Sequence, residues 1–313
     1  MLACLFYSKN NNTRRCFVYL IMDDSDVERL IKISKERPLL PETYVPWNIT
    51  PVASEIFLPE VLNSLQGLAI DDSLTDRQKL DLGRHEVVQV LYSYGWGEGL
   101  FCVFMSRYML SLQPTDVTYR FLLRELIEEY RHQEMFAQTV QQLHGEPLKP
   151  TPLHSFIGKF STKYLPHDYL FMGSLAIELV TDTYGNYSRR DNKVYTVLRK
   201  VFELHNIEEG RHIHFTKGLL QQYTQKAGYL KRSAYSFVVL FNIYFLRTMY
   251  VKKEIFERIA VVNADVVYKA AFNNYKQKFA QNCLQNILEF VDSWGGLNRA
   301  TRWAWRRLLD AKI

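Results

Sequence analysis

Apolar residues recur through most of this chain at the three- and four-residue spacing of amphipathic helices, and no useful stretch alternates between apolar and polar positions as a strand does. Thr75 or Asp76 can cap a first long helix that Pro114 stops, Asp116 can cap a second, and Asp191 can cap a fourth. The sequence therefore predicts an all-α fold. Its four long helices are expected at about residues 75–113, 115–145, 167–189 and 191–225.

The residues before the first long helix are less regular. Residues 24–36 can form a short helix, and the segment after them is expected to wrap the bundle as an irregular arm. Five prolines divide this arm: Pro38, Pro41, Pro46, Pro51 and Pro59. Residues 1–21 hold two short apolar patches without a cleavage-like site, and we interpret them as a dispensable extension. The chain is thus divided into an extension and arm (1–57) and a main domain (58–313).

The connection at residues 146–166 contains four prolines and is long enough to cross from one end of a bundle to the other. Residues 233–251 are apolar and just long enough to span a bilayer. Arg247 would be costly at membrane depth and basic residues flank both ends, so a buried or dimer-interface helix is expected and no membrane role. Amphipathic helices at about 265–281 and 299–309 complete the domain. The sequence is interpreted as having no internal repeats.

Composition narrows the class of protein. Hydrophobic residues make up 47% of the chain, which is ample for a core, and the formal charge of +6 is spread along the sequence. A nucleic-acid-binding protein would show a concentrated basic stripe or a recognisable module, and none is evident. The four cysteines lie far apart and are expected to be free thiols in a reducing compartment, the cytoplasm.

One segment carries most of the candidate chemistry. At 100° per residue, His205, Glu209 and His212 share one helix face, and Glu129 and His132 repeat the Glu-x-x-His spacing in an earlier helix. Two imidazoles and a carboxylate in an apolar helix are costly to desolvate unless a cation lies between them. Each of the other two long helices holds a lone glutamate in an apolar stretch, Glu98 and Glu178.

Together these seven residues predict a carboxylate-bridged di-metal centre inside a four-helix bundle. Oxygen and nitrogen ligands without thiolates suit non-haem iron, and manganese remains an alternative. We expect four neighbouring glutamates to be exposed or to lie behind the ligands: Glu128, Glu134, Glu203 and Glu208. The other histidines are expected to face elsewhere or to serve ordinary surface roles: His85, His144, His154, His167 and His214.

Three glycines surround Glu98, namely Gly95, Gly97 and Gly99, and each costs about 1 kcal/mol of helix stability relative to alanine. The favoured interpretation is close helix packing, and the alternative is a locally unwound turn or π-bulge that shapes a substrate pocket. The nearby residues Tyr94, Phe101 and Cys102 are candidates for the pocket lining or for plain core packing.

From about Leu58 to the C-terminus, the sequence resembles the p-aminobenzoate N-oxygenase group of ferritin-like diiron oxygenases, the arylamine oxygenases. The resemblance rests on these residues: Arg84-His85-Glu86, Glu98, Ile127-Glu128-Glu129-Tyr130-Arg131-His132, Glu178 and His205-Asn206-Ile207-Glu208-Glu209-Gly210-Arg211-His212. It implies that Glu129 and Glu209 bridge two irons. It also implies that Glu98 and His132 complete one iron, and that the other is completed by Glu178, His205 and His212.

The resemblance further implies an O2-dependent diiron monooxygenase that works through a peroxo-diferric intermediate. Its substrate would be a small molecule, and the favoured substrate is an aryl or other amine oxidised to the hydroxylamine or nitro product. Electrons would come from an external ferredoxin or reductase, because the sequence has no flavin or nicotinamide fingerprint, and the protein would be a homodimer. The alternatives are C–H hydroxylation or desaturation on the same centre, a ferritin-like iron-handling or peroxide-consuming protein, and a relative that binds metal without turnover.

Overall fold

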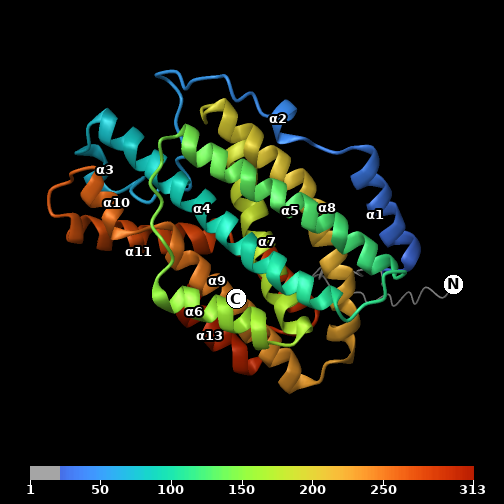
Figure 1. Cartoon of the computed structure of the whole chain (residues 1–313). Helices are drawn as coiled ribbons and strands as arrows, with labels where there is room; N and C mark the ends of the chain where they lie inside the picture. The colour runs from blue at the N-terminus through green and yellow to red at the C-terminus, as the bar shows by residue number, and fades with distance from the viewer. Residues whose placement is uncertain (1–21) are drawn as a thin grey trace, which may run out of the picture.

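The structure, a computed structural model, describes residues 22–313, so the extension at 1–21 lies outside the described residues. Four long helices form the bundle: α4 (Asp76–Met109), α5 (Val117–Gln142), α7 (His167–Arg190) and α8 (Thr196–Lys226). Helix α4 packs on α5 and α7 packs on α8, while α5 meets α8 and α4 meets α7 across the bundle (Figure 1). The described residues form no strand, which confirms the all-α prediction.

The helix boundaries follow mostly from local signals. Thr75 caps α4 by accepting a hydrogen bond from the backbone N–H of Gln78, whose side chain in turn accepts from the N–H of Thr75. Helix α4 ends at Met109, slightly before the predicted end. Helix α8 begins at Thr196 instead of directly after Asp191. The reason is a contact with the arm, because the N–H of Ile56 donates to Lys193 O and its carbonyl accepts from Tyr195 N, each at 2.9 Å.

The N-terminal arm lies along the bundle. Helix α1 (Asp24–Glu36) packs on α5, and the short helix α2 (Pro41–Tyr44) contacts α8; a third short helix, α3 (Ala69–Asp72), precedes α4 (Figure 1). Val27, Leu30 and Ile31 of α1 are buried in the same core as the bundle helices. The arm therefore contributes to the hydrophobic core that surrounds the site.

The proline-rich connection between α5 and α7 contains a helix that the sequence analysis did not predict, α6 (Pro152–Tyr164). Thr151 caps it by accepting from the N–H of His154 at 3.3 Å, and Pro152 occupies its first turn, where a missing N–H costs nothing. Helix α6 packs on α4. The connection therefore covers the bundle with a helix as well as crossing it.

The apolar segment at 233–251 is confirmed as a helix, α9 (Tyr229–Tyr250), which packs against α7, α4 and α13. The stretch Tyr229–Arg258 is long and apolar enough to cross a membrane, but 56% of its most apolar window is buried inside the protein. Arg247 is buried and paired within the protein, because it donates to Leu308 O at 2.6 Å and lies 3.3 Å from the Asp310 carboxylate. These pairings explain how a core helix carries an arginine.

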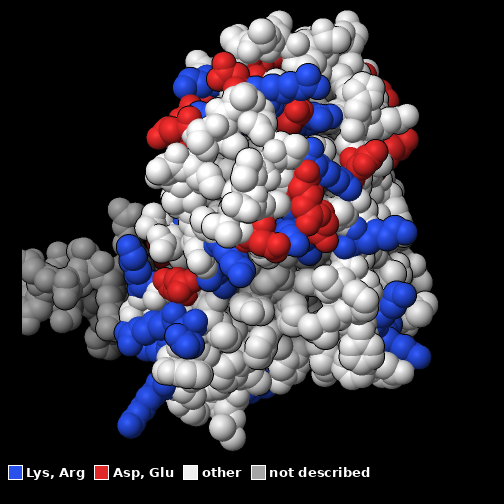
Figure 2. Space-filling view, turned by 90° about the vertical axis from the view of Figure 1, so that its left-hand side faces the viewer, with Lys and Arg blue, Asp and Glu red and all other residues white. Residues whose placement is uncertain are grey.

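Four further helices follow α9, namely α10 (Lys253–Arg258), α11 (Ala264–Asn282), α12 (Gln285–Ser293) and α13 (Arg299–Leu309). Figure 2 shows one face of the molecule, on which acidic and basic side chains alternate over the upper half. The lower half of this face is largely uncharged, with lysines and arginines at its borders. On this face the basic residues do not form one continuous stripe.

Candidate metal centre

All seven predicted site residues point into the middle of the four-helix bundle. Glu98 comes from α4, Glu129 and His132 from α5, Glu178 from α7, and the remaining three from α8. Six of them are buried, and the Glu98 side chain is only 12% exposed. The Glu-x-x-His spacing and the lone glutamates therefore identified the inward face of each helix correctly.

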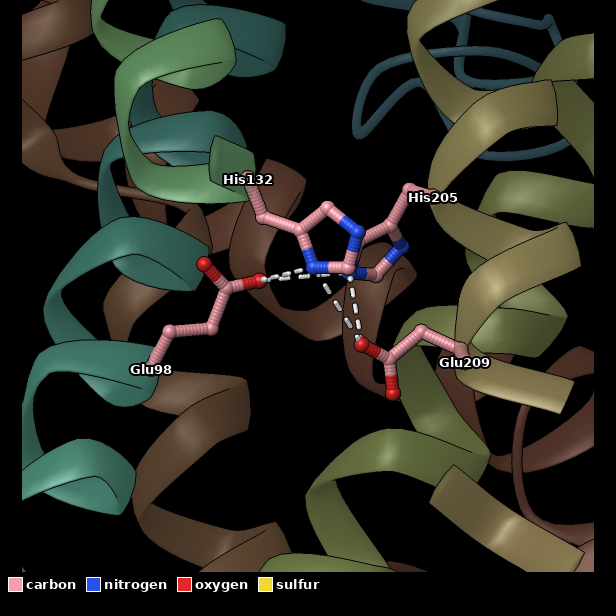
Figure 3. Close-up of side chains that lie close together, drawn as sticks. All are labelled: Glu98, His132, His205 and Glu209. Atoms are coloured by element: carbon pink, nitrogen blue, oxygen red, sulfur yellow. Dashed lines mark hydrogen bonds and ion pairs between the residues drawn. The ribbon is translucent and has the colours of Figure 1, made fainter. Parts of the chain in front are cut away.

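Four residues form a first group, shown in Figure 3: Glu98, His132, His205 and Glu209. They offer one ligand atom each within 4.8 Å of one another. His205 Nε2 lies 3.2 Å from Glu98 Oε1 and 3.4 Å from Glu209 Oε1, and His132 Nδ1 lies 3.6 Å from the same Glu209 oxygen. These nitrogens and oxygens therefore surround one small volume.

Three residues form a second group by the same criterion: Glu125, Glu129 and His212. His212 Nδ1 lies 3.1 Å from Glu129 Oε1 and 3.9 Å from Glu125 Oε1. Glu125 was not predicted, although it stands one helical turn before Glu129 and therefore shares its face. It is 1% exposed, and neither of its carboxylate oxygens has a hydrogen-bond partner among the described residues.

Glu129 and Glu209 connect the two groups. Glu129 Oε1 lies 3.1 Å from His212 Nδ1, while its Oε2 lies 3.9 Å from His132 Nδ1. Glu209 Oε1 lies 3.4 Å from His212 Nδ1 and 3.6 Å from His132 Nδ1. Both carboxylates thus stand between a histidine of one group and a histidine of the other, as bridging ligands must.

His205 lies closer to the first group of ligand atoms than to the partners that the resemblance implies for it. The resemblance places this histidine with Glu178 and His212, but its ring lies against Glu98 and Glu209, and its centroid is 4.9 Å from that of His132. His205 and His212 stand one turn before and one turn after Glu209 on α8. Both contact the same Glu209 oxygen, Oε1, at 3.4 Å, but their ligand atoms belong to different groups.

Glu178 lies at the same centre but outside both close groups. It lines a small cavity together with Glu98, Glu129 and Glu209, and both of its oxygens are buried without a hydrogen-bond partner among the described residues. Burial and the nearby Glu209 raise the pKa of Glu178 well above its ordinary value. A cation between these carboxylates would stabilise their ionised forms and so counteract that shift.

A second layer of buried charges holds the two Glu-x-x-His histidines. Glu208 Oε2 lies 2.9 Å from His132 Nε2, and Glu128 Oε2 lies 2.9 Å from His212 Nε2. Each glutamate thus contacts the histidine of the opposite helix. Arg211 bonds to Glu128 at 2.9 Å. The expectation that Glu128 and Glu208 lie behind the ligands is confirmed, whereas Glu134 is exposed and Glu203 is partly exposed.

This crossed arrangement reflects a short internal repeat, which the sequence analysis missed. Residues 125–132 read Glu-Leu-Ile-Glu-Glu-Tyr-Arg-His, and residues 205–212 read His-Asn-Ile-Glu-Glu-Gly-Arg-His. The shared Ile-Glu-Glu-x-Arg-His supplies the bridging glutamate, the outer glutamate and the inner histidine twice. At the first position of the repeat, Glu125 in α5 corresponds to His205 in α8. Comparison of the two segments would have identified Glu125 from the sequence.

The donor atoms that face inward fit a pair of cations. His132 Nδ1 and His212 Nδ1 are buried without a hydrogen-bond partner in the described residues, while their Nε2 atoms are held by glutamates. A carboxylate on one ring nitrogen leaves the lone pair of the other for a metal. Burial and the charge of Glu129 raise the pKa of Glu98 to about 7. The donor set of nitrogen and oxygen atoms suits iron or manganese.

The centre opens into two adjoining cavities. The smaller, of about 50 Å³, is lined by the site carboxylates, Tyr94 and Phe101. The larger, of about 240 Å³, lies between α4, α6, α7 and α9. Gly97 and Phe101 line both cavities, as do Ser174 and Ile177. Tyr94 and Phe101 are thus wall residues, whereas Cys102 lines neither cavity.

The glycines around Glu98 do not pack as expected. A Cβ atom added at Gly95 or Gly97 would meet nothing within 4 Å, so close helix packing is wrong at these two positions. Helix α4 also stays regular there, so the unwound alternative is wrong as well. At Gly97 the missing side chain instead leaves room where the two cavities join.

One histidine outside the centre also departs from expectation. His154 is buried, because it lies on the inner face of α6, and both of its ring nitrogens contact threonines, Thr151 and Thr248. His144 and His214 are exposed, while His85 and His167 are partly exposed. None of these five histidines belongs to either close group of ligand atoms.

A four-helix bundle that gathers glutamates and histidines from all four helices defines the ferritin-like class of di-metal proteins. Within that class, the chain belongs to the p-aminobenzoate N-oxygenase family AurF, whose model matches residues 23–295. The match includes the arm as well as the region from Leu58 onward. This family is one of oxygenases, so the protein is an oxygenase with the ferritin-like diiron fold. No curated protein matches the chain.

Proposed function

We propose that this protein is a non-haem diiron oxygenase that oxidises the nitrogen of a small-molecule amine, preferably an aryl amine, to the hydroxylamine or nitro product. The observation that carries the proposal is the pair of histidines, His132 and His212. Their Nε2 atoms are fixed by glutamates, and their inward-facing Nδ1 atoms converge on Glu129 and Glu209. Membership of the N-oxygenase family supports the nitrogen of an amine as the target.

In this proposal Glu129 and Glu209 bridge the two metal positions. Glu98, His132 and His205 complete one position, and Glu178 and His212 complete the other. Two iron ions bound there would supply the activation of O2. Manganese in place of one iron remains an alternative, because the same oxygen and nitrogen donors suit it.

The protein itself contributes positioning and the exclusion of water. Glu128 and Glu208 hold the ring orientation of the two histidines, and their charges are balanced by Arg131 and Arg211. Phe101 and Ile177 form an apolar wall between the carboxylates and the larger cavity. A substrate amine that enters from this cavity beside Gly97 would reach the centre without bulk water, and there it would be held for oxidation.

The chemistry of the proposed reaction requires a partner that donates electrons. Conversion of an amine to a hydroxylamine inserts one oxygen atom of O2 and releases the other as water, which consumes two electrons and two protons. A ferredoxin or a reductase would deliver these electrons. We also propose that the protein works in the cytoplasm and as a homodimer. Free thiols at Cys102 and Cys283 support a reducing compartment.

The test is to load the purified protein with two equivalents of Fe(II), admit O2, and follow the visible spectrum and the products with a panel of arylamines. We expect an absorption that an amine discharges, with ¹⁸O from labelled O2 in a hydroxylamine or nitro product. Hydroxylated or desaturated carbon products would support the C–H alternative instead. A featureless ferric spectrum that is indifferent to amines would favour iron handling, and failure to bind two irons would contradict the diiron proposal.

A further inference from the structure

The larger cavity beside the centre has a wall without charged side chains from the described residues. It is bounded by α4, α6, α7 and α9, and among residues 22–313 no lysine, arginine, aspartate or glutamate lines it. Aromatic and aliphatic side chains from these helices form most of it: Trp96, Leu100, Phe104, Ile157, Leu170 and Phe245. The interior therefore offers no charged partner to a ligand.

Most of the polar side chains in this wall are already paired with the protein. Ser93 donates to Gln89 O, Ser174 to Phe171 O, and Thr162 to Lys159 O. His154 uses both ring nitrogens on threonines, and burial with the nearby charge of Lys252 lowers the pKa of His154, so its ring is neutral. Asn242 Nδ2 donates to Val238 O, and the Oδ1 atom accepts no hydrogen bond from residues 22–313. The wall thus presents one amide oxygen and otherwise little polarity.

Two cations lie near the cavity without forming part of its wall. Arg107 donates through NH1 and NH2 to the carbonyl oxygens of Lys163 and Leu165 and is therefore occupied by the end of α6. Lys252 is close enough to His154 to influence its pKa, but it does not line the cavity. A carboxylate inside the cavity would have to be buried without a counter-charge, which is strongly unfavourable.

The dimensions of the cavity indicate the size of its ligand. An apolar protein cavity of about 150 Å³ holds benzene. The larger cavity here measures about 240 Å³ and joins the smaller one of about 50 Å³ at the carboxylates. There is room for one substituted ring with its amine directed past Gly97 toward Glu98 and Glu209. Helix α6 covers this space, because one face of it lines the cavity while Phe156 on the opposite face is exposed.

We propose that the substrate is an uncharged, largely apolar arylamine of about one ring, which lies in the cavity between α4, α6, α7 and α9, and that arylamines with a carboxylate opposite the amine are excluded. This inference rests on the proposed function. The proposed substrate differs from p-aminobenzoate, the substrate in the family's name, because p-aminobenzoate would place its carboxylate against the uncharged wall. Asn242 Oδ1 lies in this wall and is suited to accept a hydrogen bond from a polar substituent.

The test compares p-aminobenzoate with its methyl ester, which keeps the ring, the amine and the carbonyl group but removes the charge. Binding to the full chain is measured without O2, by quenching of the fluorescence of Trp96, a wall residue, and by calorimetry. We expect the ester to bind at least about 30-fold more tightly than the acid. The Trp96→Phe variant should lose the quenching while calorimetry still detects the ester. Equal or tighter binding of the acid would overturn the inference, and so would the absence of binding by either ligand.

A second test introduces a positive charge into the cavity wall and compares it with an uncharged substitution at the same position. Asn242→Lys should improve binding of p-aminobenzoate at least about tenfold and weaken binding of the ester, whereas Asn242→Met, of similar length and uncharged, should keep the preference for the ester. If Asn242→Lys does not fold, Ser161→Lys and Ser161→Met on α6 form a second pair. Unchanged binding of the acid in folded lysine variants would mean that the ligands bind elsewhere and would overturn the inference.

Measurements of turnover distinguish failure of this inference from failure of the proposed function. If the ester binds as expected but the iron-loaded protein does not oxidise it in O2, the proposed function fails while the charge preference of the cavity stands. If the iron-loaded protein oxidises p-aminobenzoate faster than the ester, the N-oxygenase function stands and the inference about the substrate is wrong.

Discussion

The two halves of the candidate metal centre are built from the same sequence repeat, yet they differ in composition. The half around Glu98 holds two imidazoles, His132 and His205, whereas the half around Glu129 holds only His212 and is otherwise surrounded by carboxylates. Behind both halves the supporting glutamates are equivalent, each 2.9 Å from a histidine Nε2. The asymmetry of the centre therefore begins at one position of the repeat, where His205 corresponds to Glu125.

This difference suggests distinct tasks for the two metal positions. A position with two neutral imidazoles carries less negative charge than one surrounded by carboxylates, so an iron bound there is less strongly stabilised in its higher charge state. The imidazole-rich half also includes Glu98, which lines the smaller cavity that the substrate amine would reach from the larger one. The comparison predicts that substitutions will affect one iron, the other, or both, according to the half that they change.

The largest effect is expected from Glu209→Ala, because this carboxylate contacts all three histidines at 3.4 to 3.6 Å. Both irons should be lost, and oxidation should be abolished. Iron is measured per folded chain after Fe(II) loading and desalting. Glu134→Ala on the exposed side of α5 serves as the control and should retain two irons. Two irons and full turnover in Glu209→Ala would show that this residue is not a ligand.

His205→Ala and Glu178→Gln test the division into halves. Each variant should retain one iron, and the double variant should retain none, because the two residues are assigned to different metal positions. If the double variant still binds one iron, both residues serve the same metal, as the resemblance alone implies. His214→Ala is the matched control for the histidine, since it lies on the same helix and is exposed. Mössbauer spectra of ⁵⁷Fe-loaded single variants would show which iron environment remains.

The sequence predicted much of this arrangement because the decisive signals are local. Caps, helical spacing and lone glutamates are properties of single helices, and they indicated the bundle and its seven inward-facing residues. The start of α8 was misplaced because Ile56, far away in the chain, holds residues 193–195 in an extended bridge. Helix α6 was missed because its prolines suggested breaks, although Pro152 occupies a favourable first turn.

Other features depend on how the helices pack, and no local pattern contains them. The position of His205 beside Glu98 depends on the distance between α8 and α4. The space at Gly97 is visible only when the neighbouring helices are in place, because glycine is equally compatible with close contact and with a cavity. Glu125, in contrast, could have been found by aligning residues 125–132 with residues 205–212.

A smaller effect is expected from the supporting glutamates. Glu208→Gln removes the charge behind His132, and Glu128→Gln removes the charge behind His212. Loss of such a partner typically weakens metal affinity by about 10- to 100-fold. Each variant should weaken one binding step in an anaerobic Fe(II) titration, the former in the imidazole-rich half and the latter in the other half. Equal weakening of both steps by each variant would show that the two halves are not independent.

The pH dependence of the protein's thermal stability should invert when iron binds. In the metal-free protein, burial raises the pKa of Glu98 to about 7, and neighbouring carboxylates raise the pKa of His132 and His212 well above the ordinary value. These folded-state pKa values lie above the unfolded ones, so all three groups favour the folded state at low pH. The stabilisation from Glu98 is lost as pH rises from its ordinary pKa toward about 7, and that from the two histidines is lost as pH rises above their ordinary pKa. Thermal unfolding temperature should therefore fall between pH 6 and pH 8.

Iron should reverse this trend, because it binds the deprotonated carboxylate and neutral imidazoles and so competes with protons. Affinity for Fe(II) should rise about tenfold per pH unit for each proton released, and the loaded protein should become more stable across the same interval. The pKa of Glu129 is lowered to about 2, so this group stays ionised and adds no dependence there. Calorimetry in buffers of different ionisation enthalpy would count the released protons, and a value of zero would contradict the assignment.

The smallest effect is expected at Glu125, the counterpart of His205. Burial raises the pKa of this carboxyl group to about 8, so it is largely protonated at neutral pH in the metal-free protein. If Glu178 is the ligand that completes this half, Glu125→Gln replaces a neutral carboxyl group with a neutral amide of the same shape and should retain two irons with little change in affinity. The comparison with Glu178→Gln is direct, because both substitutions change one buried glutamate near His212. If Glu125→Gln loses an iron and Glu178→Gln does not, the carboxylate-rich half is completed from α5, by the residue that corresponds to His205 in the repeat.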